Sequence, residues 1–340
     1  MLLSIEVSRR FKLVSALSMV GILFIHSKFI NSRWGEDFGS SLYSYVSVSL
    51  QYLISEQITR ICVPLFFMIS GYFFYYKYDG TLKSYYIQLQ KRFKSTLIPY
   101  FLWSLSWYII YNITKLKFLD FSDLFNSFIN PIPYQFWFLQ ILIFCFIVSP
   151  VFFFLIKKLP KITILILLIF YFIDISSFKS EIYGFGFFYL GAYLRYFKVK
   201  LNKKLITTLI SIYLLTIISG LILFILQDNE YFLYRIILHK ISILSGLLFV
   251  IYYIFEGINN DRFFKNSILA MDSGFFFFLF AAHEPLLSFL KKIWIQLFSS
   301  SYSLFAFFFL PILLFISIKY VYIFLKKITP QILCFYTGNR

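Results

Sequence analysis

The chain is short of charged residues, and above all of acidic ones. Only 14% of its residues are Asp, Glu, Lys or Arg, and 15 of its 340 residues are acidic, whereas 60% are hydrophobic and 24% are aromatic. A water-soluble domain carries about 25% charged residues. The composition therefore excludes an ordinary soluble fold and indicates an integral membrane protein.

Cysteine and histidine are also scarce. Cys62, Cys145 and Cys334 all fall in apolar runs and form no disulfide framework. The three histidines stand apart from any cysteine cluster, so no zinc-ligand spacing occurs and we expect no metal. A formal net charge of +17 would elsewhere suggest nucleic acid. In a membrane protein, basic residues held in cytoplasmic loops explain it, and we expect no nucleic-acid partner.

Ten apolar runs approach or exceed the length that a bilayer-crossing helix needs, which is about 20 residues. The runs lie at 12–30, 58–76, 97–114, 136–156, 162–176, 182–197, 205–226, 235–255, 267–290 and 302–325. Residues 42–56, which mix apolar residues with many serines, are typical of an interfacial segment rather than a span. We therefore expect an all-α integral membrane protein that forms a single transmembrane domain over residues 1–340.

The loops between these runs predict the topology. With a cytoplasmic N-terminus, basic residues on the inner side outnumber those on the outer side by roughly two to one, which places both termini in the cytoplasm. Lys291 and Lys292 break this rule on the outer side. They are either incidental or a patch that faces an anionic partner.

Four ionisable residues lie inside the expected spans, where each charge costs about 2.5–3.5 kcal/mol on insertion scales and is a functional candidate by default. At a rise of about 1.5 Å per residue, His26 lies ~21 Å, Arg60 ~26 Å, and His283 with Glu284 ~27 Å from the inner boundary of its span. All four thus fall in the outer third of a hydrocarbon core about 30 Å thick.

Structural roles compete with functional ones at these positions. Arg60 could reach the outer interface with its long side chain. His283 and Glu284 could mark a helix end in water, and His26 could be a neutral histidine bonded to a backbone group. A histidine with a pKa near 6.5 is nevertheless suited to taking a proton from a hydroxyl. His239 is more in keeping with a structural role.

A basic cluster on the inner side suggests a second kind of chemistry. Lys91, Arg92 and Lys94 precede the third expected span. They are either an anchor at the membrane surface or a phosphate cradle for a nucleotide-bearing cofactor, because Arg and Lys pair well with phosphate oxygens. Ser70 and Tyr72 flank a glycine that allows close backbone approach, for a ligand or for helix packing alone.

The segments that carry these residues resemble the membrane-bound acyltransferase-3 family. The most specific is RICVPLFFMISGY, which resembles the second-span signature of the family. The other matches follow in the order of the family: Leu13–His26, KRFKSTLIPYFLW at residues 91–103, YQFWFL at residues 134–139 with Ser149 and Pro150, Phe185–Gly191, and Phe278–Pro285.

This resemblance implies a bacterial inner-membrane protein with about ten spans that transfers an acyl group, usually acetyl from acetyl-CoA, to hydroxyls of surface polysaccharides. Two positions depart from the family pattern. Ser15 stands where a basic residue is usual, and Gln135 stands where a histidine often precedes the aromatic pair. These departures weaken any mechanism that needs either residue and leave His26, Arg60 and Trp137 as candidates.

The resulting hypothesis assigns a role to each candidate. His26 is the general base, Arg60 stabilises negative charge, and His283 is a second acid/base or positioning group. We expect acetyl-CoA to be bound by Lys91, Arg92, Lys94, Ser70, Tyr72 and Tyr100, and the glycan by Trp137, Gln135 and Glu284.

A rival interpretation is an exporter of glycan or acyl groups without covalent chemistry. The expected partners are acetyl-CoA, a surface glycan or lipid-linked oligosaccharide, and membrane lipid, and a homo-oligomer is compatible with the sequence. The sugar, the hydroxyl, the size of the acyl group, and transfer through an acetyl-histidine all stay open.

Overall fold

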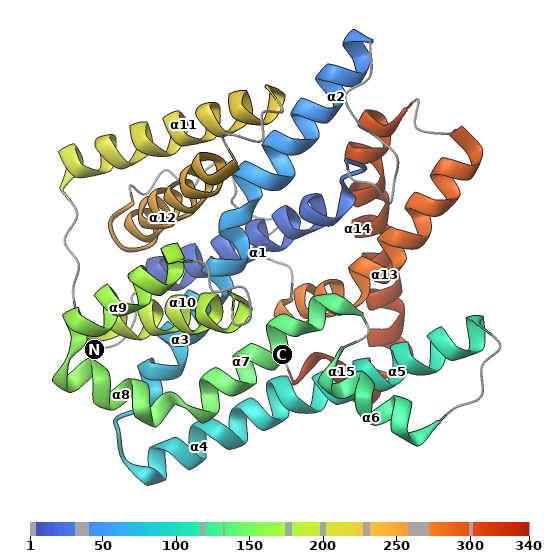
Figure 1. Ribbon diagram of the computed structural model, residues 1–340. Coiled ribbons are helices and arrows are strands. Elements are labelled where there is room, and N and C mark those ends of the chain that lie inside the picture. The colour runs from blue at the N-terminus through green and yellow to red at the C-terminus, as the bar shows by residue number, and fades with distance from the viewer. Residues whose placement is uncertain are drawn as a thin grey trace. The chain divides into compact units, whose positions relative to one another are not determined.

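The computed structural model describes residues 5–30, 41–115, 120–131, 133–173, 179–197, 202–226, 232–257, 272–298 and 302–339. Every regular element within these ranges is a helix, as the sequence predicts (Figure 1). The ends of two expected spans, at residues 174–176 and 267–271, lie outside the described residues.

The chain divides into two compact units, each built from three separate stretches of sequence. The first comprises residues 1–66, 199–271 and 286–315, and the second comprises residues 67–198, 272–285 and 316–340. Helices α3 (Cys62–Lys77), α13 (Ser273–Phe298) and α14 (Ser303–Ile328) each contribute to both units. Because the units are interleaved along the chain, this division does not test the single domain expected over residues 1–340.

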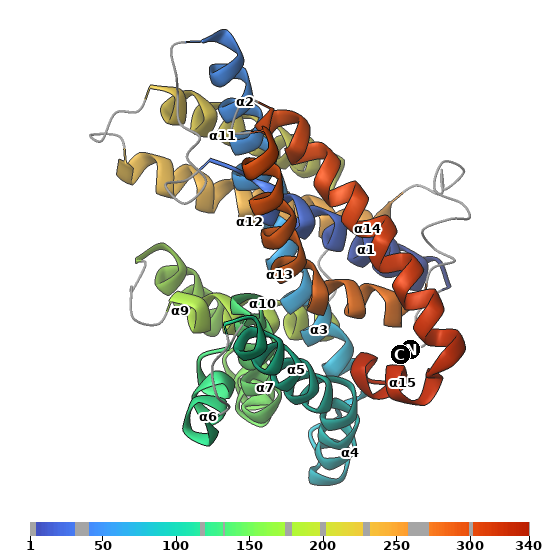
Figure 2. The ribbon, with the colours of Figure 1, turned by 90° about the vertical axis from the view of Figure 1, so that its right-hand side faces the viewer.

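The first unit is organised around α1, in which Arg10 binds the end of another helix. It contains α1 (Ile5–Ser27), α2 (Leu42–Tyr52), α11 (Lys203–Ile225) and α12 (Phe232–Glu256). Helices α11 and α12 lie side by side, and α1 packs on α12 (Figures 1 and 2). Arg10 is 5% exposed and its Nη1 donates to the carbonyl oxygen of Ile254, in the last turn of α12, at 3.3 Å. A basic residue near the start of α1 therefore caps the C-terminus of α12.

The second unit holds the shorter helices. They are α4 (Leu82–Arg92), α5 (Ile98–Thr114), α6 (Phe121–Ile129), α7 (Trp137–Ile147), α8 (Ser149–Lys158), α9 (Pro160–Ile173), α10 (Lys179–Tyr196) and α15 (Pro330–Thr337). Helix α10 packs on α7, α8 and α9, and α15 packs on α5. Figure 1 shows α4 leading directly into α5.

Two of the long helical runs contain a wider π-helical turn, at η1 (Leu53–Ile58) and at η3 (Phe93–Leu97). Each is followed within a few residues by a proline, Pro64 or Pro99. Proline has no N–H, so the carbonyl four residues earlier loses its helical donor. That carbonyl belongs to Ser95, inside η3, and to Arg60, two residues beyond the end of η1. Local widening is one way in which a helix accommodates such a break, and π turns occur frequently at functional sites.

Helix length and composition support six or seven of the ten expected spans. Five candidates are α1, α11, α12, α13 and α14, and the sixth is the continuous run Leu42–Lys77. A seventh is counted when Ser122–Ile129 and Tyr134–Ile147, which are bent by 59°, form one span. Helix α9 has 14 residues and covers only ~21 Å of a ~30 Å core.

The structure corrects two boundaries. Residues 42–56, expected to be an interfacial segment, are helical and continue through η1 and a short 3-10 turn, η2 (Thr59–Ile61), into α3. The expected span at 136–156 is broken at Val148 into α7 and α8, because Pro150 cannot continue the hydrogen-bond ladder of α7.

Candidate functional site

Glu56 joins two cations in the first unit. It lies in the π turn η1, accepts a hydrogen bond from Arg60 Nε at 2.8 Å, and forms ion pairs with Arg60 Nη2 and with Lys28 Nζ. Lys28 follows the end of α1 by one residue, so the ion pairs connect the turn after α1 to the helix that carries Arg60. Two cations therefore share one carboxylate.

The backbone of four residues at and beyond the end of α1, His26–Phe29, forms hydrogen bonds with side chains from two other helices. We call these four residues the α1 end segment. Lys291 Nζ, from α13, donates to the carbonyl oxygen of His26 at 3.2 Å and to that of Lys28. Gln51 Oε1, from α2, accepts the N–H of Phe29 at 2.7 Å. The first unit therefore links the backbone of the α1 end segment, which includes His26, to Arg60 through Lys28 and Glu56.

Lys28 loses its proton at a lower pH than an ordinary lysine does. Burial of its amine, and secondarily the positive charge of Arg60, lower the pKa of Lys28 from 10.5 to about 8, although Glu56 accepts a hydrogen bond from it. Desolvation disfavours the charged form of an amine, and a neighbouring cation acts in the same direction. The positive charge of Lys28 is therefore lost at mildly alkaline pH.

A second polar focus lies in the second unit, at the carbonyl oxygen of Ala281. Pro285 stands four residues later in α13 and has no N–H to donate to it. Trp107 Nε1, from α5, donates to this oxygen at 3.1 Å, and Gln135 Nε2 donates at 3.5 Å. The structure thus brings Gln135 within one helical turn of His283.

His283 is 0% exposed and its Nδ1 lies 2.6 Å from the carbonyl oxygen of Phe280. Because a carbonyl only accepts hydrogen bonds, Nδ1 carries the proton and Nε2 carries the lone pair of the neutral ring. Glu284 is half-buried. Trp137 is half-buried beside Phe67, with ring centroids 6.1 Å apart. Among the described residues, Gln135 Oε1 is buried and accepts no hydrogen bond.

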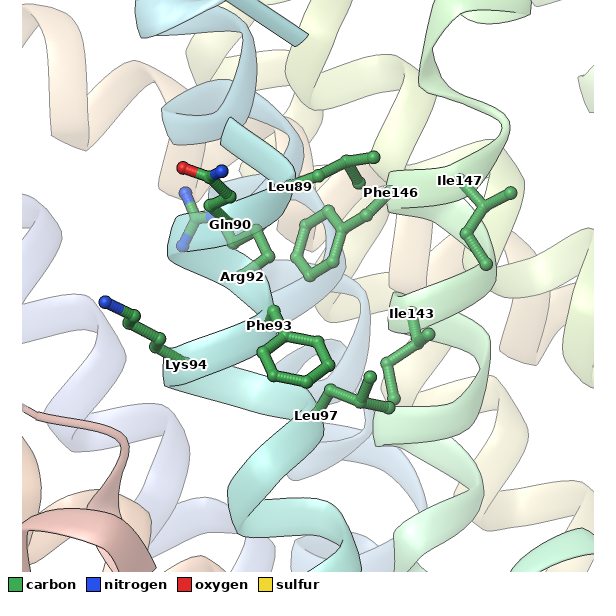
Figure 3. Close-up of a pocket in the computed structure, with 9 residues that line it drawn as sticks. All are labelled: Leu89, Gln90, Arg92, Phe93, Lys94, Leu97, Ile143, Phe146 and Ile147. Atoms are coloured by element: carbon green, nitrogen blue, oxygen red, sulfur yellow. The ribbon is translucent and has the colours of Figure 1, made fainter. Parts of the chain in front are cut away.

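The basic residues predicted to hold a phosphate do not all line the same cavity. Arg92 and Lys94 line a cavity of about 550 Å³ between the α4–η3 run and α7, whereas Lys91 is exposed and does not line it. Figure 3 shows Phe93 and Ile143 on the apolar side of this cavity, with the ammonium of Lys94 pointing away from them.

Arg92 is the one basic residue of this group with a buried polar atom. Its guanidinium carbon lies 5.3 Å from the centre of the Phe146 ring, and burial lowers the pKa of Arg92. Among the described residues, nothing accepts a hydrogen bond from its buried Nε. An anionic acceptor such as a phosphate fits this donor.

The other residues predicted to bind acetyl-CoA, which are Ser70, Tyr72 and Tyr100, lie in contacts between helices. Ser70 and Tyr72 flank Gly71, where an added Cβ would lie 2.1 Å from the carbonyl oxygen of Phe188 in α10. Tyr100 is 4% exposed and its hydroxyl donates to the carbonyl oxygen of Phe128. Both arrangements fix helices against one another within the second unit.

Sequence reasoning missed Glu56 and Trp107, and it left Lys291 as either incidental or part of a patch that faces an anionic partner. Glu56 had a visible signal, because it precedes Arg60 by four residues and such pairs face each other on a helix. Because residues 42–56 were expected to be an interfacial segment, Glu56 was not placed on the same helix as Arg60. Lys291 faces backbone carbonyls and is 2% exposed, so it is no patch for an anionic partner. No local signal identifies Trp107 as the donor to Ala281.

A comparison with known protein families matches residues 11–324 to an acyltransferase domain. The chain belongs to the acyltransferase-3 family. The matched region contains both polar networks and the cavity beside Arg92. It confirms the family to which the sequence motifs pointed.

A curated relative supports the same assignment. The chain is 24% identical to the succinoglycan biosynthesis protein ExoH of Rhizobium meliloti (strain 1021), over 98% of this chain and 93% of that protein. No solved structure matches the chain. Within the described ranges, His, Cys, Asp and Glu form no group of three or more that could hold a metal ion.

Proposed function

We propose that this protein is an O-acyltransferase of a bacterial cytoplasmic membrane that moves an acetyl group from acetyl-CoA to a sugar hydroxyl of a surface polysaccharide or its lipid-linked precursor. The observation that carries the proposal is the match to the acyltransferase domain over residues 11–324. The relationship to a protein of succinoglycan biosynthesis supports a polysaccharide as the acceptor.

The polar network of the first unit supports a role for His26 and Arg60. In the proposed reaction, His26 takes the proton from the acceptor hydroxyl as that oxygen forms a bond to the acetyl carbon. When bound, acetyl-CoA supplies the activated thioester, whose C–S bond breaks. His26 then returns the proton to the departing sulfur, which balances the reaction.

Arg60 stabilises the negative charge that develops on the acetyl oxygen, as preorganised cations do in other acyl transfers. Glu56 holds two nitrogens of the Arg60 guanidinium and so fixes its orientation. Arg92, with its buried Nε, is the strongest candidate for a phosphate contact of the donor, with Lys91 and Lys94 adding charge at the same helix end. His283 and Gln135 are proposed to position the acceptor.

The deciding experiment uses the purified protein in lipid nanodiscs with acetyl-CoA labelled in the acetyl group and glycan isolated from a strain that lacks the gene. Label that appears on the glycan as an alkali-labile ester, with release of CoA, supports the proposal. Glycan that the protein moves across a vesicle membrane with unchanged mass would instead identify an exporter.

A further inference from the structure

Lys291 is a buried lysine whose charge serves the backbone at the end of α1. It is 2% exposed, although lysine is almost never fully buried unless its ammonium is paired. Its Nζ donates to the carbonyl oxygens of His26 and Lys28 and lies 5.0 Å from the centre of the Phe29 ring. His26, Lys28 and Phe29 all belong to the α1 end segment.

These contacts satisfy backbone carbonyl groups at the C-terminus of α1. The last carbonyl groups of a helix have no donor within the helix, and they carry partial negative charge. A lysine ammonium satisfies both the hydrogen bonds and the charge. An apolar residue of similar length would fill the same volume without the cost of burying an ammonium. What the ammonium adds over such a residue is its hydrogen bonds to the α1 end segment.

We propose that Lys291 is the positioning residue that holds His26 in place for acyl transfer, an inference that rests on the proposed function. Lys291 fixes the carbonyl of His26 itself and that of the residue two positions later, so the backbone is held on the C-terminal side of His26. The imidazole extends from this held backbone. Gln51, through the N–H of Phe29, completes the support at the far end of the segment.

The test compares Lys291→Met with Lys292→Met. The two changes remove the same charge from adjacent residues of one helix, but Lys292 is exposed. We expect kcat per inserted molecule to fall about 10- to 100-fold in Lys291→Met, because a displacement of about 1 Å at a catalytic group costs up to about 10²-fold. KM for acetyl-CoA stays unchanged, and Lys292→Met retains wild-type kcat.

Two further variants keep the proposal testable if Lys291→Met does not fold. Lys291→Arg keeps the charge and the donors and restores most of the lost kcat. Lys291→Gln keeps a neutral donor on a shorter side chain and falls between Arg and Met. Reduced abundance with wild-type kcat per molecule, in whichever variants insert, overturns the proposal and leaves Lys291 a purely structural role.

A readout independent of acyl transfer separates this inference from the proposed function. Diethyl pyrocarbonate modifies accessible imidazoles, and the rate at His26 is measured by peptide mass spectrometry, with His239 as internal reference. We expect a faster rate at His26 in Lys291→Met and an unchanged ratio in Lys292→Met. If wild type transfers no acetyl group, the proposed function fails while this comparison still stands. Equal rates at His26 in all variants would overturn the positioning role.

Discussion

The indole Nε1 of Trp107 donates a hydrogen bond of 3.1 Å to the carbonyl oxygen of Ala281, the group that Pro285 leaves without its helical donor. Proline breaks the ladder of α13, and a side chain from α5 restores the lost bond. A break that would otherwise leave a buried backbone acceptor unsatisfied is thereby tolerated in an apolar helix.

Trp107→Phe therefore destabilises the protein by about 1–3 kcal/mol, the cost of leaving a buried acceptor poorly satisfied. The measurement is thermal unfolding in detergent. Trp294→Phe is the matched control, because the buried Nε1 of Trp294 makes no hydrogen bond among the described residues. Equal losses of stability in the two variants would show that ring packing, rather than the bond to Ala281, matters.

His26→Ala lowers acetyl transfer by about 10²–10⁴-fold, the usual contribution of a general base. Activity is measured as acetyl ester formed per inserted molecule. His239→Ala, which changes a half-buried histidine in α12, keeps wild-type activity. Unchanged transfer by His26→Ala would remove His26 from the mechanism.

Glu56→Gln leaves Lys28 and Arg60 without the carboxylate that joins them and lowers both stability and acetyl transfer. The cluster is half-buried, and removing one partner of such a charge cluster costs more than removing a balanced pair. The double variant Glu56→Gln/Lys28→Met therefore recovers part of the stability lost in Glu56→Gln. An additive loss in the double variant, measured by unfolding in detergent, would contradict the coupling.

The lowered pKa of Lys28 predicts a pH dependence of stability. The unfolded chain holds the Lys28 proton up to pH 10.5, whereas the folded protein releases it near pH 8. Unfolding therefore takes up a proton between these values, and the Lys28 contribution to the free energy of unfolding rises with pH from about 8 to 10.5. Lys28→Met lacks this rise. Identical pH profiles for the wild type and Lys28→Met would refute the shift.

Replacing Lys91, Arg92 and Lys94 together by Gln weakens CoA binding at least about tenfold, because a charge-assisted hydrogen bond is worth about 1.5–3 kcal/mol. Calorimetry in detergent measures the dissociation constant. The control replaces the exposed residues Lys158, Lys203 and Lys204 by Gln, which changes the net charge equally. If both triple variants bind CoA like the wild type, the phosphate cradle is excluded.

Sequence patterns predicted the helices better than their ends. Apolar runs of about 20 residues reveal helices in a membrane protein because the bilayer leaves few alternatives for the backbone. The π turns η1 and η3 allowed two helices to continue where the sequence suggested a boundary. Sequence analysis therefore assigned residues 42–56 to an interfacial segment and Arg60 to the next span. This placed Glu56 and Arg60 in different elements.

The amino-acid sequence by itself determined that this protein is helical, that it is built for lipid, and that it resembles the acyltransferase-3 family, because composition and motif order are properties of the chain alone. Only the tertiary structure decided which groups meet. Lys291 and His26 are far apart in sequence, and no local pattern encodes a hydrogen bond between them. Such pairings depend on how helices pack, which the polarity of single residues does not specify.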